Sequence, residues 1–288
     1  MTEQTAPPVL PPVPDTPPAV PDPAASTVPP AKVKKDRPVL RAVLRWTAAV
    51  AVFAAVGSAT AYGITRMERT DVPGLATESD GRWPYPVLTR PPLPSGSPGP
   101  FAETNKAGAH YADLRALLLP APEGADDDKA LRGKDGWLAT DDFLKEYRDA
   151  SERPELRQKL VDHGLRHITA RGWTTEDGTH TRIYLLQFDT AAVVDELRNR
   201  HLAPYNAPGY AVRGTEEVVA DDRFPARAEI NDLLYSVYVE PEPFGAEQVR
   251  QAYLGAGDVL AVIVHSRKGG AGAVPFQQTV ALQSQLLS

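Results

Sequence analysis

One stretch of this chain has the composition of a membrane-spanning segment. Residues 46–65 carry no charged side chain, and a helix of about 20 residues matches a hydrocarbon core of about 30 Å. Six basic residues and one acidic residue lie directly before it, within residues 32–45. Because basic flanks remain in the cytoplasm, the sequence predicts a single-pass protein of the cell membrane, with a cytoplasmic N-terminus and residues 66–288 extracytoplasmic.

The alternative interpretation of this stretch is a cleaved signal peptide. Ala59-Thr60-Ala61 fits the small-x-small rule for cleavage after Ala61. The preceding region of about 45 residues is much longer than the basic region of a usual signal peptide. An uncleaved signal anchor over residues 39–66 is therefore the favoured interpretation.

Small residues recur at every fourth position of the anchor. Such a ladder lets a second helix approach closely, which predicts a homodimer or another membrane partner. The alternative is that an alanine-rich segment produces the ladder by chance. The predicted small-residue face consists of Thr47, Ala51, Ala55, Ala59 and Gly63.

Proline-rich segments flank the anchor on both sides. The chain has 29 prolines, 11 of them before residue 31, and such a composition cannot bury enough apolar surface to fold. Residues 1–38 are predicted to form a disordered cytoplasmic tail, whose PxxP spacings fit either a docking peptide or an inert spacer. Residues 67–107 are predicted to form an extracytoplasmic stalk, in which Trp83 and Tyr85 either pack back on the domain or bind a partner.

Residues 108–288 are the part of the chain that can build a core, and helical and strand patterns alternate along it. The predicted fold is α+β, with a mainly antiparallel sheet of about five strands and helices packed largely on one face. The apolar run Val259–Val264 predicts a central strand covered on both faces. Asp177-Gly178 predicts a type I′ hairpin turn. The expected helices are 110–119, 140–150, 154–164, 189–202, 245–255 and 274–287, and the expected strands lie within 165–174, 179–188, 233–240 and 258–266.

Several of these helices have recognisable ends. Thr140 is expected to cap the second helix, and Pro154 to begin the third. Gly164 should end that third helix. Its inner face is expected to carry Leu156, Leu160 and Val161.

Composition excludes several classes of protein. The absence of cysteine rules out disulfides, thiolate metal sites and a lipid anchor on cysteine. Residues 66–288 contain 25 basic and 33 acidic side chains, a net charge of −8. Nucleic-acid binding is therefore not expected, since it needs clustered positive charge.

No motif in the sequence nominates a catalytic, cofactor-binding or metal-ligating residue. His163 and His167 have the spacing of a helical metal pair, but Gly164 should end the helix between them. The acidic loop 125–136 lacks the register of a calcium loop. One glycine-rich loop is a candidate for anion binding through its backbone, although a plain strand-to-helix connection explains it equally well. This loop comprises Arg267, Lys268, Gly269 and Gly270.

The order of tail, anchor, stalk and small outer domain resembles that of actinobacterial single-pass envelope proteins. It is also similar to the membrane-anchored sensor domains of bacterial receptor kinases, although residues 1–45 contain no kinase signature. The topology, together with the lack of a catalytic motif, predicts a non-enzymatic envelope protein whose outer domain binds a protein partner or ligand. One alternative is an exported hydrolase, in which His163, His167 or His180 would meet a carboxylate in a cleft. The other is a structural scaffold or spacer with no binding pocket.

Overall fold

The computed structural model describes residues 38–66, 79–204 and 206–288. The chain divides into two compact units, Met1–Ala76 and Thr77–Ser288. The predicted disordered tail and the first part of the predicted stalk, residues 67–78, lie outside the described residues.

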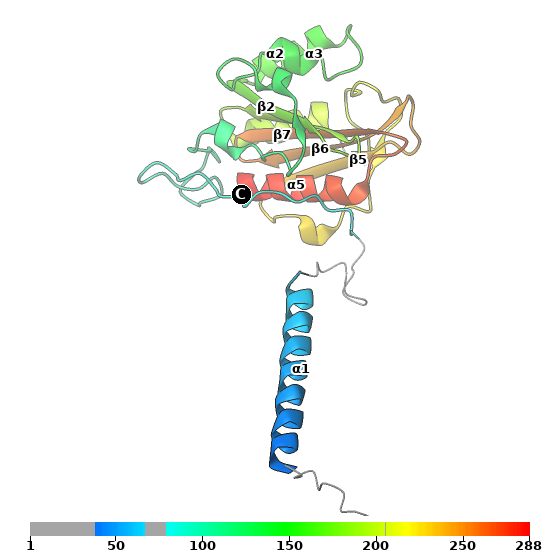
Figure 1. Cartoon of the computed structure of the whole chain (residues 1–288). Helices are drawn as coiled ribbons and strands as arrows, with labels where there is room; N and C mark the ends of the chain where they lie inside the picture. The colour runs from blue at the N-terminus through cyan, green and yellow to red at the C-terminus, as the bar shows by residue number, and fades with distance from the viewer. Residues whose placement is uncertain (1–37, 67–78, 205) are drawn as a thin grey trace, which may run out of the picture. The chain divides into compact units, whose positions relative to one another are not determined.

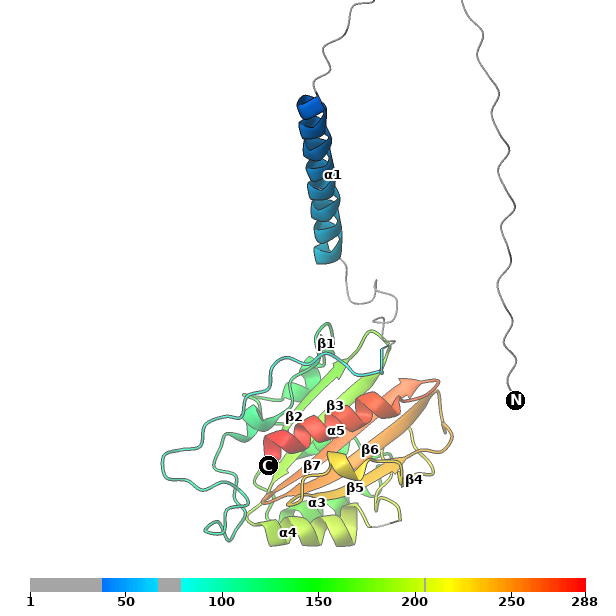
Figure 2. The same cartoon turned by 90° about the horizontal axis from the view of Figure 1, so that it is seen from below.

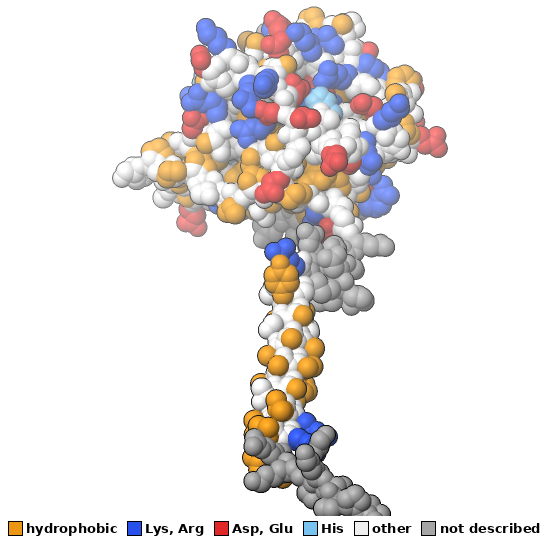
Figure 3. Space-filling view, in the orientation of Figure 1, with side chains coloured by type: hydrophobic (Ala, Val, Ile, Leu, Met, Phe, Trp, Pro, Cys, Tyr) orange, Lys and Arg blue, Asp and Glu red, His pale blue; other side chains and the backbone are white. Residues whose placement is uncertain are grey.

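Helix α1 (Pro38–Arg66) is the described part of the first unit. It is long and apolar enough to cross a membrane, and none of its residues is buried within the chain. Hydrophobic side chains cover much of its surface, with basic side chains towards its ends (Figure 3). The hydroxyls of Thr47 and Thr65 donate to the carbonyls of Val43 and Tyr62, at 2.9 and 3.0 Å. These polar groups are thus satisfied within the helix, as an apolar environment requires.

The second unit is built on one antiparallel sheet of seven strands, in the order β1-β2-β3-β7-β6-β5-β4. The α+β class and the antiparallel sheet are confirmed, but the predicted number of about five strands is wrong. Two of the additional strands, β1 and β4, are two-residue pairings at the edges, too short to leave a pattern in the sequence. The strands are β1 (Asp126–Asp127), β2 (His167–Thr174), β3 (His180–Gln187), β4 (Val219–Ala220), β5 (Leu234–Val239), β6 (Glu247–Ala256) and β7 (Val259–Lys268).

Strand β6 corrects a predicted helix over residues 245–255. It pairs along its whole length with β7, and residues 250–255 also pair with β5. Alternate side chains face opposite layers, with Tyr253 in one hydrophobic core and Leu254 in the other. The segment is rich in helix formers, and pairing with two neighbouring strands overrides that preference.

Helices cover both faces of the sheet, so the prediction that they pack largely on one face is wrong (Figures 1 and 2). One core joins β3 and β7 to α2 (Thr140–Leu144), α3 (Arg153–Asp162) and α4 (Ala191–Leu197). The other core lies beneath α5 (Ala273–Leu287). Strand β7 is buried on both faces, as its apolar run predicts, and such a strand needs a layer on each side.

Residues 79–93 correct the predicted boundary of the domain. They were expected within an extended stalk, but the compact unit begins at Thr77, and this segment, here called the strap, runs along α5 (Figure 1). Tyr85 and Leu88 pack against the core beneath α5. Prolines prevent the strap from forming a helix or an inner strand, but they do not prevent its aromatic side chains from packing.

The ends of α2 and α3 agree only in part with the predictions. Helix α3 has Pro154 in its first turn, and Gly164, at φ 73°, follows its end as predicted. Val161 is 61% exposed rather than inward. Helix α2 is capped at Ala139 rather than Thr140. It ends at Leu144, so it is shorter than the predicted helix 140–150.

Two other local predictions are wrong. The helix expected over residues 110–119 is one 3₁₀ turn, Leu114–Leu117, capped by Asp113. The β2–β3 hairpin is present, but positive φ occurs at Gly178 and not at Asp177. The connection is thus a five-residue loop, closed by the bond from Thr175 N to Thr179 O at 3.0 Å, and not a type I′ turn.

Candidate functional site

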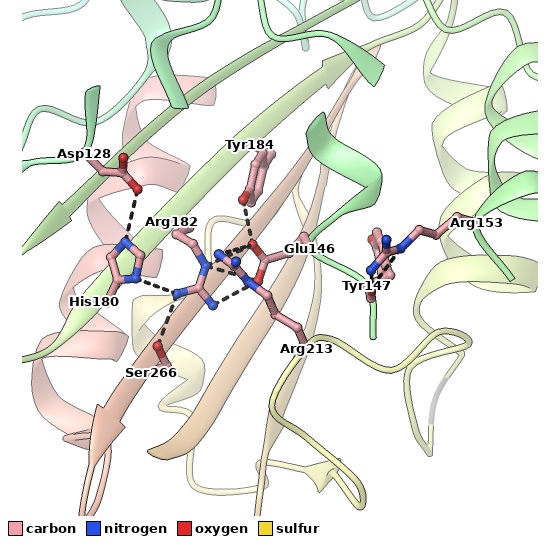
Figure 4. Close-up of polar contacts among 9 residues, drawn as sticks. All are labelled: Asp128, Glu146, Tyr147, Arg153, His180, Arg182, Tyr184, Arg213 and Ser266. Carbon is pink, nitrogen blue, oxygen red and sulfur yellow. Dashed lines mark hydrogen bonds and ion pairs between the residues drawn. The ribbon is translucent and has the colours of Figure 1, made fainter. Parts of the chain in front are cut away.

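The most unusual feature of the domain is an ion pair inside the core beneath α2 and α3. The side chain of Glu146, just after α2, is fully buried, and that of Arg182 on β3 is 3% exposed. Arg182 Nε lies 3.1 and 2.9 Å from the two carboxylate oxygens, and its Nη2 lies 2.9 Å from Oε1 (Figure 4). The hydroxyl of Tyr184 donates to Oε2 at 2.6 Å. Both oxygens of the buried carboxylate therefore accept hydrogen bonds from protein donors. Such bonds replace the lost contacts with water and lower the free-energy cost of burying the charge.

The Arg182 guanidinium also donates hydrogen bonds to two further polar side chains. Its Nη1 donates to Nδ1 of His180 at 3.0 Å and to Oγ of Ser266 at 3.1 Å. Asp128 lies on the other side of the imidazole, 3.4 Å from Nε2. Burial and the Arg182 charge lower the pKa of His180. His180 is thus neutral, with Nδ1 accepting and the proton on Nε2 facing Asp128.

Arg213 extends the network towards solvent. Its Nη2 lies 3.5 Å from Glu146 Oε2, yet its side chain is 52% exposed. The backbone holds it there, because Arg213 N donates to Glu146 O at 2.8 Å and Val212 bridges to Tyr147. Arg213 therefore presents a guanidinium whose second face is open to water.

Four residues of this network, His180, Arg182, Arg213 and Ser266, line a cavity of about 460 Å³ that opens to solvent. This volume falls within the range of small-molecule sites. Its lining combines positive, negative and neutral polar groups with glycine backbone. The lining residues are His180, Arg182, Arg213, Gly214, Gly245, Ala246, Glu247, Val249 and Ser266.

The hydrogen bonds in the cavity do not form a hydrolytic pair. A serine nucleophile needs a base nitrogen that accepts its proton. Arg182 instead donates to both Ser266 Oγ and His180 Nδ1, and the remaining nitrogen of His180 faces Asp128. Among the described residues of the cavity, Ser266 and His180 are therefore joined through Arg182 and not to each other.

The other histidines considered in the sequence lie apart from this cavity. The ring of His163 is 5.6 Å from that of His201, and the ring of His167 is 4.6 Å from that of Trp137. Of the three histidines expected in a hydrolytic cleft, His180 alone lies beside a carboxylate within the described residues. Those residues also contain no group of three or more side chains that could hold a metal ion.

The predicted anion-binding loop connects β7 to α5. Arg267 is already engaged with Asp177, through a bond of 3.0 Å from Nε to the carbonyl oxygen. The amides of Gly270 and Ala271 have internal acceptors, at 3.4 Å and 3.0 Å. Lys268 and Gly269 are exposed. Anion binding at this loop stays a prediction.

The predicted small-residue face lies on α1, and all five of its residues are exposed there. A step of four residues turns a helix by about 40° beyond a full turn, so the ladder winds around α1 as a right-handed stripe. A second helix follows such a stripe at a right-handed crossing. Association through this face stays a prediction.

No protein-family model matches this chain, and no curated protein matches it. The resemblance to single-pass envelope proteins thus remains one of layout.

No motif in the sequence singles out Glu146, Arg182 or Arg213. One signal was present for Arg182, since a charge stands inside an otherwise uncharged strand, residues 181–188. A charge in a buried strand requires a partner. Nothing near it in the sequence identifies that partner as Glu146, which lies 36 residues away.

Proposed function

We propose that this chain is a non-enzymatic, single-pass membrane protein whose C-terminal unit is an extracytoplasmic binding module. Helix α1 supports the anchor, and the basic residues before it support a cytoplasmic N-terminus. The observation that carries the binding proposal is the open cavity whose polar lining is held in place by a buried ion pair. A structural spacer needs no such site, and preorganised polar groups are what recognition requires.

The cavity favours a small polar ligand, or a partner side chain, that carries an anionic group. Arg213 is the half-exposed cation of the lining, and it can form two parallel hydrogen bonds to a carboxylate or phosphate. Glu247 on the same rim would pair with a cationic group of the same ligand. Neutral His180 adds a polar contact without a charge.

A thermal-shift screen of the full-length protein in detergent tests the cavity. The panel is phosphate, simple carboxylates and free amino acids. We expect at least one member to raise the melting temperature of the wild type, and Arg213→Met to abolish that rise because the guanidinium is removed. Arg200→Met is the matched control, since Arg200 is a 72% exposed arginine paired with Glu196 away from the cavity. A panel with no stabilising member, or a rise that survives Arg213→Met, contradicts the proposal.

The intact mass of the mature protein tests the anchor. We expect the chain from the membrane fraction to retain Met1 or Thr2, because α1 is long enough to span the bilayer without processing. A chain that begins at Tyr62 in the soluble fraction would identify a cleaved signal peptide instead.

A further inference from the structure

The strap is held to α5 by bonds that imitate backbone pairing. The side-chain amide of Gln278 accepts from Trp83 N at 2.8 Å and donates to Trp83 O at 2.9 Å. The hydroxyl of Tyr85 lies 3.0 Å from Thr279 Oγ1. Further along, Arg90 Nε donates to the carbonyl of Gln285 at 2.9 Å. One face of the helix thus recognises an extended proline-rich peptide.

The two aromatic side chains of the strap, Trp83 and Tyr85, pack on side chains of the sheet. The ring of Trp83 stacks on that of His265, with centroids 5.4 Å apart and an interplanar angle of 20°. Tyr85 meets Trp173 edge to face at 6.4 Å. Trp173, Thr181 and His265 form one row across β2, β3 and β7.

Each residue of this row carries a polar side-chain atom that is buried and has no hydrogen-bond partner among the described residues: Trp173 Nε1, Thr181 Oγ1, and both ring nitrogens of His265. Together with Phe276, whose ring lies 5.1 Å from His265, this row and the strap-facing side of α5 form the strap groove. Uncovering the groove would expose apolar rings. A peptide that fills the groove is therefore favoured by the burial of these rings.

Apart from its bonds to α5, the strap accepts one backbone bond, from Glu123 N to Pro84 O at 2.8 Å, and it is not a strand of the sheet. Its removal therefore breaks no ladder. The residues that follow it form a turn, with Ser97 N bonded to Pro94 O at 3.0 Å and Gly96 at φ 80°. Four prolines hold the strap extended, which lowers the entropy lost when it docks.

We propose that the strap groove is an exchangeable peptide site, and that the strap of a second copy of this chain can fill it. Every copy carries both the groove and its matching peptide, so reciprocal exchange preserves all the contacts above in a dimer. This proposal does not depend on a ligand in the cavity. It rests on the proposed membrane anchor in one respect, because anchoring both copies in one bilayer raises the local concentration of straps.

Cysteine cross-linking tests the exchange directly, because the chain contains no cysteine. A Cβ atom on Gly81 would lie 3.6 Å from Cβ of Val274, within the range for a disulfide. We expect co-expressed full-length Gly81→Cys and Val274→Cys chains to form a mixed disulfide dimer in membranes. Reductant should remove this dimer, and adding Trp83→Ala to the Gly81→Cys chain should reduce it to background. Gly81→Cys with Val161→Cys, an exposed position on α3, sets that background.

Mixed dimer at or below the background, while the Gly81→Cys/Val274→Cys double variant closes its own disulfide, overturns the proposal. Gly81 has φ 83°, which a cysteine adopts only with strain. If the double variant fails to close, a labelled peptide of residues 79–93 provides the decision. It should bind full-length Trp83→Ala protein, and the same peptide with Trp83→Ala should not. Equal binding of the two peptides, or no binding, also overturns the proposal.

Discussion

Replacing Arg182 with methionine is expected to lower the free energy of unfolding of the C-terminal unit by about 3–5 kcal/mol. The substitution leaves the Glu146 carboxylate fully buried, with Tyr184 and the more distant Arg213 as its remaining side-chain partners. A buried charge without adequate compensation is among the largest single costs in a folded protein. Urea unfolding of the full-length protein, followed by tryptophan fluorescence, measures the loss.

Arg213→Met is the matched control, because it removes an arginine that contacts the same carboxylate from a half-exposed position. Its cost should stay below about 1 kcal/mol, as for other solvent-screened pairs. The double variant Glu146→Leu/Arg182→Met should recover part of the stability lost in Arg182→Met, since it removes both charges together. Equal losses for Arg182→Met and Arg213→Met would show that the buried pair does not stabilise the core as described.

The contrast between these two arginines shows how much of the site the sequence contains. Position 182 lies in a strand whose apolar pattern is strong, so its charge is conspicuous. Position 213 lies in a loop, where an arginine is ordinary. The pairing of both with Glu146 depends on how the α2 region and the 212–213 loop meet over β3. That arrangement is tertiary, and no local pattern encodes it.

The sequence predicts an element well where the pattern of its apolar residues and the residues at its two ends indicate the same structure. The uncharged run of α1, the apolar strand β7 and the hairpin of β2 and β3 are of this kind. Strand β6 fails because its composition favours a helix, while two long neighbouring strands offer it hydrogen bonds on both sides. The prediction that the strap is part of an extended stalk is wrong for a different reason. Its partners Gln278 and Thr279 lie almost 200 residues later in the sequence, and a proline-rich composition gives no sign of the groove that receives it.

Acid is expected to destabilise the C-terminal unit through His265. This imidazole is fully buried, and burial, with the Arg182 and Arg250 charges, lowers its pKa to about 3. Asp177 acts in the opposite direction, and His180 adds a smaller lowering. In the unfolded chain the same group has a pKa near 6.5. Between these two values the unfolded state binds a proton that the folded state does not, so stability decreases as the pH falls below about 6.5.

The expected size of this effect is about 1.4 kcal/mol for each pH unit, or about 3 kcal/mol between pH 6 and pH 4. His265→Phe should remove this part of the pH dependence, because phenylalanine cannot bind a proton. Its stability at pH 7 should be equal to or above that of the wild type, since the ring contacts of Trp83 and Phe276 remain and two unpartnered polar atoms are lost.

Urea unfolding of both proteins from pH 7 to pH 4 measures the difference, and His163→Phe, outside the strap groove, is the control. The His265→Phe curve should be flatter than that of the wild type below pH 6. Because Trp83 of the strap covers this imidazole, and burial disfavours the charged imidazole, protonation should oppose docking of the strap before it unfolds the sheet. Trp83 should therefore become accessible to a soluble quencher at a higher pH than the main unfolding transition. Parallel curves for His265→Phe and the wild type would show that His265 binds its proton as readily in the folded state as in the unfolded chain.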